Sequence, residues 1–298
     1  MPYVDSRLSE VARDRMSHEY TDSVLYERLS TTVGESSPFA GVLKHLSTTE
    51  NKHYEFWRRY VSDEEPRVDR LKVYWVLFLR RVLGLTFASR YLDRHEESVV
   101  RGYQAIEGMI PDGDRVAFEE MVADEQAHER ELAHSVESTA VRYISFIVLG
   151  LADSLVEISG IHAGALGIYD KTEIAGLAGV VAGAAASMAM ASAAYAQAKQ
   201  GFEGSAKMSA IYTGVSYFVS AVFLATPYFL TPDMIYALSA SMGLAVVQLA
   251  LTTYYSTVIT NKPFRRDFLE ILAILLGATV VLYVSGYVVH IQTNLTIS

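Results

Sequence analysis

The sequence DEQAH at residues 124–128 carries the pattern that decides the fold. Glu125 and His128 are three residues apart, so on a helix their side chains share one face and can bind one metal ion together. The same spacing occurs earlier in the chain, at Glu50 and His53. Two such pairs on separate helices, with one further Glu from each of two other helices, form the inner shell of a carboxylate-bridged di-iron site in a four-helix bundle. The pattern therefore predicts an all-α domain built around a metal site.

The two remaining ligands are predicted from a repeat. Glu19 and Glu96 lie 31 and 29 residues before the Glu of a Glu-x-x-His pair, and each is followed seven residues later by a tyrosine. The two hairpins therefore look like copies of one unit. This repeat selects Glu19 over Glu27, and Glu96 over Glu97, which stays open as the alternative. The predicted metal ligands are Glu19, Glu50, His53, Glu96, Glu125 and His128.

Charge divides the 298-residue chain into two parts. Residues 1–139 contain 26 acidic and 18 basic side chains, whereas residues 140–298 contain 8 and 7, within a net charge of −9. The acidic first part argues against nucleic acid as a partner and is compatible with cations. The chain has no Cys, which excludes disulfides, thiolate metal sites and a rubredoxin-type iron centre. We therefore expect a metal-binding domain at 1–138 and a membrane domain at 139–298.

The charged part reads as helices joined by short turns. The first helix is expected over 6–32, and the second starts at Ser-Ser-Pro, residues 36–38, and runs to about residue 61. A third helix contains Glu96, and Pro-Asp-Gly-Asp at 111–114 predicts a turn before the fourth. The polar N-terminus lacks the apolar core of a signal peptide, which predicts that this domain stays in the cytoplasm.

The segment LKVYWVLFLRRVLGLTFASRYL, residues 71–92, is apolar enough to resemble a membrane span. Arg80 and Arg81 would then lie at the bilayer centre, at roughly 2.5–3.5 kcal/mol each. Spanning would also place the two Glu-x-x-His pairs on opposite sides of the membrane. We therefore expect a helix that lies on the membrane surface or in a dimer contact, and that continues into the helix of Glu96.

Five later segments reach or exceed the ~20 apolar residues that span a bilayer. They are Val141–Tyr169, Ile174–Ala198, Met208–Leu230, Met234–Ile259 and Phe268–Val289. Cations concentrate in the second and fourth connectors, at Lys199, Lys207, Lys262, Arg265 and Arg266. Cationic loops stay on the cytoplasmic side. The sequence thus predicts a multi-pass protein of the inner (plasma) membrane, with its first domain in the cytoplasm and its C-terminus outside.

Two acids stand inside the first of these segments. Asp153 and Glu157 are four residues apart and so share one helix face. Ionisable groups at that depth usually face a pathway or the bundle interior, which predicts a cation or proton role. Glycines in the second segment favour close helix packing. Met188 in that segment is expected to fill space between helices, although its thioether is also a ligand for softer metals. His162 and His290 are expected to be structural.

Residues 6–137 resemble the rubrerythrin branch of the ferritin-like superfamily, through the six predicted ligands in their order along the chain. The resemblance implies two irons, bridged by the Glu of each Glu-x-x-His motif and held terminally by the His. It also implies ferrous binding and oxidation by oxygen or peroxide. The chain lacks the Cys-rich rubredoxin module of rubrerythrins proper.

Residues 140–290 are similar to the vacuolar iron transporter family of five-span, dimeric metal/proton antiporters. The likeness rests on Gly150-x-x-Asp153-x-x-x-Glu157, the Gly-rich second span, Ser-Met-Ala at 187–189, and Tyr195. The resemblance implies a metal path at the dimer interface lined by Asp153 and Met188, with Glu157 as a further ligand. The long Glu-rich insertion of plant-type members is absent. Both modules in this order resemble the membrane-bound ferritins of prokaryotes.

These observations lead to one hypothesis and two rivals. The hypothesis is a homodimeric exporter of Fe²⁺ that runs against inward proton movement, with a cytoplasmic di-iron domain that captures iron. Oxidation of the captured iron by this domain stays open. The first rival is an enzyme, a membrane-tethered ferroxidase or peroxide scavenger whose spans only anchor it. The second is a manganese exporter, because carboxylate and His ligands accept Mn²⁺ as well as Fe²⁺.

Overall fold

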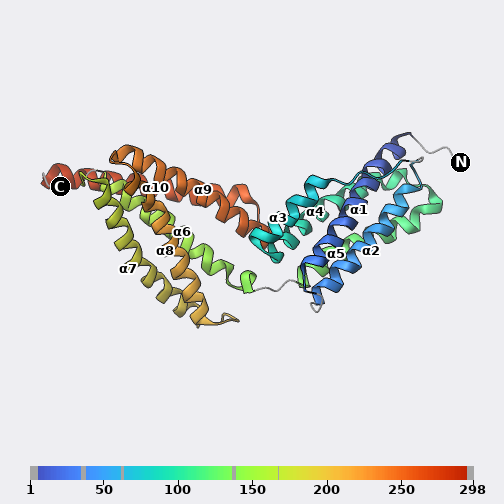
Figure 1. The fold of residues 1–298 in the computed structure, drawn as a ribbon, viewed down its shortest axis with the longest axis horizontal. Coiled ribbons are helices and arrows are strands. Elements are labelled where there is room, and N and C mark those ends of the chain that lie inside the picture. The colour runs from blue at the N-terminus through green and yellow to red at the C-terminus, as the bar shows by residue number, and fades with distance from the viewer. Residues whose placement is uncertain (1–5, 35–37, 62–63, 136–138, 167, 294–298) are drawn as a thin grey trace. The chain divides into compact units, whose positions relative to one another are not determined.

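The computed structural model describes residues 6–34, 38–61, 64–135, 139–166 and 168–293. Within these ranges, side chains are described except at 6, 38, 93–101, 104–105, 128–135, 139–141, 290 and 292–293. The described chain is all-helical, with ten α-helices, two short 3₁₀ helices and no β-strand (Figure 1). It divides into two compact units, Met1–Ser138 and Thr139–Ser298, hereafter unit 1 and unit 2.

Unit 1 contains five of the α-helices. They are α1 Ser6–Thr32, α2 Pro38–Arg58, α3 Arg70–Leu83, α4 Leu85–Ile106 and α5 Arg115–Ser135, with 3₁₀ turns at Glu107–Met109 and Asp112–Asp114. The most extensive packing in this unit is between α1 and α2, which form a hairpin, and α4 packs on α5. The boundaries of α1 agree with the sequence expectation, whereas α2 ends three residues before the expected residue 61.

The segment 71–92 differs from its expectation, because it is divided at Gly84. This residue has φ 90° and ψ 168°, a conformation that L side chains rarely adopt and glycine adopts freely. Helix α3 therefore ends at Leu83, and α4 starts as a separate helix at Leu85. Unit 1 thus has one more α-helix within its described residues than the four that the sequence predicts.

Two hydrophobic clusters hold unit 1 together. The first is rich in aromatic rings, with Trp57 stacked on Tyr103 at 5.9 Å between centroids and Phe118 edge-on to both. The second joins α1 and α2 to the inner face of α3, where Val73, Val76 and Leu79 are buried. The side chain of Asp69 accepts a hydrogen bond from the backbone N–H of Lys72 and so caps the start of α3.

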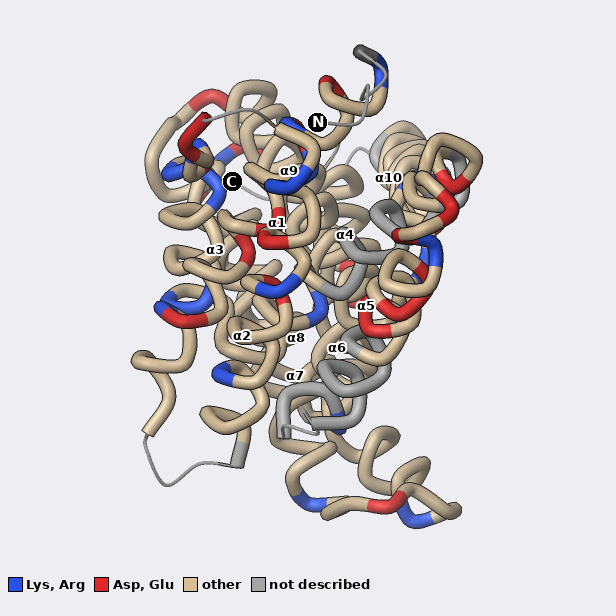
Figure 2. Tube along the Cα trace, turned by 90° about the vertical axis from the view of Figure 1, so that its right-hand side faces the viewer, with Lys and Arg blue, Asp and Glu red and all other residues tan. Residues whose placement is uncertain are grey.

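Unit 2 consists of five helices, all long and apolar enough to cross a membrane. They are α6 Thr139–Ala165, α7 Thr172–Ala198, α8 Ala206–Leu230, α9 Met234–Thr260 and α10 Phe264–Thr293. Many large apolar side chains of this unit are exposed, and only 6% of the most apolar window of α10 is buried. Such surfaces are stable when lipid is the solvent. Charged residues are frequent in the helices of unit 1, whereas α6 to α10 carry few. Figure 2 marks the charged positions of the described chain.

Helix α8 packs against α6, α7 and α9, and α6 packs in addition against α10. Glycines permit this approach, since a Cβ on Gly150 of α6 would lie 2.3 Å from the backbone oxygen of Thr213. A Cβ on Gly183 of α7 would lie 2.6 Å from the Cβ of Ala221. The Thr213 hydroxyl donates to the backbone oxygen of Phe146, 3.0 Å away. Close packing therefore fixes the helix that carries the two acids.

Candidate metal centre and membrane acids

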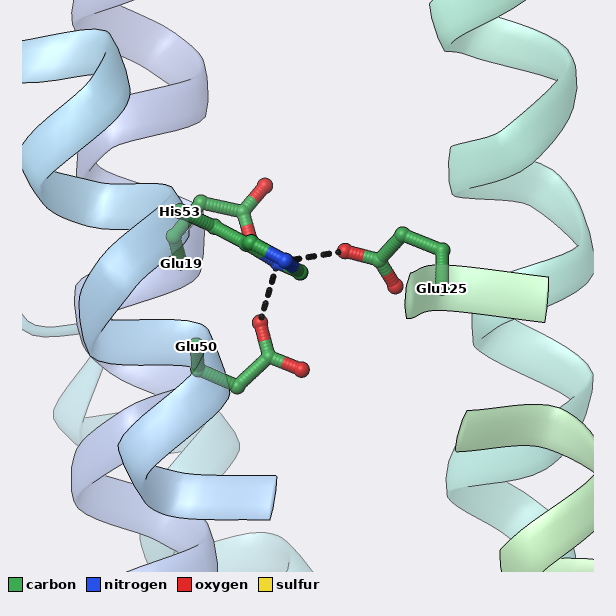
Figure 3. A group of neighbouring side chains, drawn as sticks. All are labelled: Glu19, Glu50, His53 and Glu125. Carbon is green, nitrogen blue, oxygen red and sulfur yellow. Dashed lines mark ion pairs between the residues drawn. The ribbon is translucent and has the colours of Figure 1, made fainter. Parts of the chain in front are cut away.

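Four of the six predicted ligands meet inside unit 1. Glu19 comes from α1, Glu50 and His53 from α2, and Glu125 from α5, and one ligand atom of each lies within 4.8 Å of the others. Figure 3 shows Glu125 reaching across from α5 toward the side chains on α1 and α2. All four residues are buried, each exposing 2–3% of its surface. The chain thus places three carboxylates and one imidazole in a single enclosed volume.

His53 is at the centre of this cluster. Its Nδ1 lies 3.1 Å from Glu125 Oε1, 3.6 Å from Glu50 Oε2 and 3.9 Å from Glu19 Oε2. The first two contacts are drawn in Figure 3. Glu50 and His53 are one helical turn apart, which explains why they share a face of α2. The i, i+3 spacing in the sequence therefore predicted this contact correctly.

Burial and mutual repulsion dominate the electrostatics of the cluster. Burial raises the pKa of Glu19 well above its ordinary value, and the carboxylates of Glu125 and Glu50 raise it further. Burial alone lowers the pKa of His53, but hydrogen bonds to Glu125 and Glu50 and the nearby negative charge outweigh it and raise this pKa to about 11. In the metal-free protein, protons therefore supply part of the positive charge that the carboxylates require.

Two further side chains position the cluster, and neither was predicted to do so. The buried Tyr103 of α4 donates its hydroxyl to Glu19 Oε1. Asp124, which is half exposed, places Oδ2 3.6 Å from the other ring nitrogen of His53. A ligating His commonly has its second nitrogen held by a carboxylate. The spacing of Tyr103 after Glu96 marked it only as part of a repeat, because contacts between helices are not encoded in spacing along one helix.

An ion pair between Lys72 of α3 and Asp22 of α1 lies beside the cluster. Lys72 Nζ lies 2.6 Å from Asp22 Oδ1, and both side chains are four-fifths buried. Burial raises the pKa of Asp22 to about 6, although Lys72 opposes this, and the carboxylates of Glu50 and Glu125 add to the increase. Asp22 is therefore part of the same negative field, and Lys72 supplies one compensating charge.

The residues of the cluster fit a divalent cation. Three ionised carboxylates and one protonated imidazole have a net charge of −2, and buried charge of one sign is unstable without a counter-charge. Oxygen and imidazole nitrogen donors suit Fe²⁺, Mn²⁺ and related ions. The cluster therefore offers the ligands for one metal ion.

Two predicted ligands fall outside the described side chains. Glu96 lies in α4 and His128 in α5, but their side chains, and that of the alternative Glu97, are outside the part of the chain that the structure describes. These two of the six predicted ligands thus stay a prediction.

The acids of unit 2 are less enclosed than those of unit 1. Asp153 and Glu157 are both half-buried on α6. The hydroxyl of Tyr217, a fully buried residue of α8, donates to Glu157 Oε2 at 2.6 Å. Tyr217 is a residue that the sequence analysis missed. It holds one acid of the pair in place and leaves Asp153 without a described hydrogen-bond donor.

Met188 and His162 have different surroundings. Met188 is 73% exposed on α7, where it lines an apolar groove between α7 and α8. Within one chain its thioether is therefore on an outer surface. His162, expected to be structural, is fully buried beside the ring of Tyr228, with centroids 4.2 Å apart. The side chain of His290 is not among those described.

Comparison with protein-family models, with curated proteins and with solved structures finds no match to this chain.

Proposed function

We propose that the protein exports a divalent metal ion, Fe²⁺ in the first instance, across the inner membrane, with unit 1 as a cytoplasmic domain that captures the ion. The observation that carries the proposal is the buried Glu19, Glu50, His53 and Glu125 cluster in the same chain as five helices able to span a membrane. The sequence resemblance of unit 1 to rubrerythrins and of unit 2 to vacuolar iron transporters also supports this function.

Unit 1 captures the ion in this proposal. A bound iron centre at the cluster would supply oxidation chemistry with oxygen or peroxide. The chain's own contribution is to hold Glu19 through Tyr103, to orient His53 from both ring nitrogens, and to keep water out of a volume that is almost fully buried. Glu96 and His128 complete the site for a second ion in this proposal.

Unit 2 supplies the path. Asp153 and Glu157 share one face of α6, and carboxylates there bind a cation when ionised and release it when protonated. This exchange accounts for antiport of metal against protons. Met188 belongs to the path only if a second protomer packs against α7, which fits its exposure on one chain. The cationic connectors support an orientation with unit 1 in the cytoplasm and the C-terminus outside.

The enzyme alternative has its own support. The metal cluster is closed and has a tyrosine hydroxyl on one of its carboxylates, an arrangement that also suits a tethered ferroxidase or peroxide scavenger. Half-buried acids on α6 argue against spans that serve only as an anchor. A manganese exporter differs from the main proposal only in the ion.

Metal flux in proteoliposomes separates these functions. The purified full chain is reconstituted with an imposed proton gradient, and Fe²⁺ or Mn²⁺ entry is followed with a trapped fluorescent chelator. Asp153→Ala is compared with Asp170→Ala, an exposed acid in the connector after α6. Transport predicts that the first variant loses most of the flux and the second keeps it. Equal flux from the wild type, both variants and empty liposomes would leave the tethered enzyme as the better account, and the relative Fe²⁺ and Mn²⁺ rates assign the ion.

A further inference from the structure

Helix α3 has an apolar outer face that no described residue of unit 1 covers. Its inner face is already buried in the core of unit 1 through Val73, Val76 and Leu79. The outer face carries five large apolar residues at helical spacing, with between 48% and 80% of each exposed. They are Leu71, Tyr74, Trp75, Phe78 and Val82. A helix that is apolar on both faces is normally covered on both.

A cationic pocket adjoins this face. It encloses about 670 Å³ between the end of α1 and the start of α3, and none of its lining residues is acidic. Three arginines line it, Arg28, Arg67 and Arg70, together with Tyr74 of the apolar face. The guanidinium of Arg28 lies 6.0 Å from the centre of the Tyr74 ring. The pocket therefore joins a site for an anionic group directly to a large apolar surface.

We propose that α3 lies in the interface of an anionic bilayer, with its outer face among the lipid chains and a lipid phosphate in the arginine pocket. Tryptophan, tyrosine and arginine are the residues that favour the zone between headgroups and acyl chains. Arginine also binds phosphate oxygens through paired hydrogen bonds. The outer face and the pocket therefore match the two parts of one lipid molecule.

The chain also ensures that a bilayer is near. Unit 2 has five helices able to cross a membrane, and only three residues separate the end of α5 from the start of α6. Because so short a segment tethers unit 1 to the membrane helices, the bilayer surface has a high effective concentration for unit 1. A modest intrinsic affinity of α3 for lipid is therefore sufficient for binding. This consideration favours the bilayer over a second copy of the chain, and it does not depend on what the protein transports.

The two tryptophans of the chain make the proposal testable in the intact protein. Trp75 is on the outer face of α3, whereas Trp57 is fully buried in the aromatic core of unit 1. The full chain is placed in liposomes that contain phosphatidylglycerol with either ordinary or brominated acyl chains. The contribution of Trp75 to the emission is the difference between the wild type and Trp75→Phe. Brominated lipid should quench more than half of this contribution. It should leave the emission of Trp57, measured in Trp75→Phe, nearly unchanged. Equal emission in both lipids overturns the proposal.

The pocket is tested by charge reversal. Arg67→Glu/Arg70→Glu should reduce the quenching of Trp75 at least two-fold in anionic liposomes, and excess inorganic phosphate should not reproduce the effect. The control Arg58→Glu/Arg115→Glu has the same change of charge at two exposed arginines on α2 and α5 and should quench like the wild type. Equal loss in both double variants, or release by phosphate alone, contradicts a lipid in the pocket.

A second copy on α3 is the competing occupant. The natural chain has no Cys, so Phe78→Cys introduces a single reporter thiol on the outer face. Under mild oxidation in the same liposomes, the proposal predicts no disulfide-linked dimer through this position. Efficient dimer formation together with a Trp75 that brominated lipid does not quench would assign the face to a contact between copies and overturn the proposal.

Discussion

The acids of unit 1 and those of unit 2 differ in how completely the protein encloses them. In unit 1, three carboxylates surround one imidazole and each residue exposes no more than 3% of its surface. In unit 2, Asp153 and Glu157 are half-buried and one tyrosine hydroxyl holds the second of them. A sealed cluster with many ligands suits retention of a cation, whereas a partly open pair suits its passage. The contrast is therefore consistent with one site that captures and one that transfers.

Removal of two ligands should have the largest effect and tests whether unit 1 retains metal at all. Glu50→Ala/Glu125→Ala removes two of the three carboxylates that form the cluster with His53, and we expect metal affinity to fall by more than ~100-fold, since even outer partners contribute about 10–100-fold. The measurement is a titration of the detergent-solubilised chain with Fe²⁺ or Mn²⁺ by calorimetry. Glu55→Ala/Glu120→Ala, which alters exposed acids on the same two helices, should bind like the wild type. Unchanged affinity in the first variant would place the retained metal elsewhere.

A change of pH should have the next largest effect on metal affinity. It distinguishes the sealed cluster of unit 1 from the half-buried acids of unit 2, because a sealed cluster must exchange protons for metal. The pKa of His53 is raised to about 11 and that of Glu19 is also raised, so the metal-free cluster holds protons at pH 7. Metal binding displaces them, and apparent affinity should rise about tenfold per pH unit for each proton displaced. Calorimetry in buffers of different ionisation heat counts these protons. Affinity that is constant between pH 6 and 8 would contradict this account.

The same shifts have a consequence for the stability of the metal-free protein. Between pH 6.5 and about 11, folded His53 holds a proton that the unfolded chain has released. The contribution of His53 to the free energy of unfolding is therefore fully present below pH 6.5. It decreases by roughly 1.4 kcal/mol per pH unit as the pH rises above this value. Raised Glu19 acts in the same direction above its ordinary pKa. The metal-free fold should thus be more stable at pH 6 than at pH 8 in thermal scans, and bound metal should remove this difference.

Sequence anticipated which residues gather in the sealed cluster better than it anticipated their surroundings. The i, i+3 spacing of Glu50 and His53 is a property of one helix, and the hairpin repeat selected Glu19, which the structure places in the same cluster. The role of Tyr103 and the position of Asp124 follow from how α4 and α5 pack, which local spacing does not encode. The break at Gly84 was also missed, because a single glycine within an apolar run is compatible with a continuous helix.

In unit 2, sequence predicted the long apolar helices but not the contacts of the acids. Hydropathy and length identified five segments, and five helices able to cross a membrane are found there. The bond from Tyr217 to Glu157 joins residues 60 positions apart, and nothing in the pattern of α8 distinguishes this tyrosine from its neighbours. The exposure of Met188 likewise depends on which face of α7 the other helices cover. The expected dimer and the metal path therefore stay predictions.

Helix packing should have a smaller effect on stability, and it tests whether the acids of α6 depend on the contact with α8. Gly150→Ala would place a Cβ 2.3 Å from the backbone oxygen of Thr213, so the helices must move apart. We expect a loss of about 1–3 kcal/mol in stability, as for other overpacked sites. Thermal unfolding of the detergent-solubilised chain measures it. Gly277→Ala on α10, which meets no atom within 4 Å, should be neutral or stabilise by up to about 1 kcal/mol. Equal stability of the two variants would contradict the tight contact.

The smallest effects should come from two matched tyrosines, one at each site. Tyr103→Phe and Tyr217→Phe each remove a hydroxyl that donates to a carboxylate, on Glu19 and Glu157 respectively. A hydrogen bond to a charged group contributes about 1.5–3 kcal/mol, but a metal ion bound to Glu19 would compensate for most of the lost hydrogen bond. We therefore expect Tyr103→Phe to weaken metal binding by less than about tenfold without changing transport at saturating metal. Tyr217→Phe should leave binding to unit 1 unchanged and alter the rate and pH profile of flux, because Glu157 loses its one described donor. If both variants change the same parameter, the two sites do not have the separate roles that their enclosure suggests.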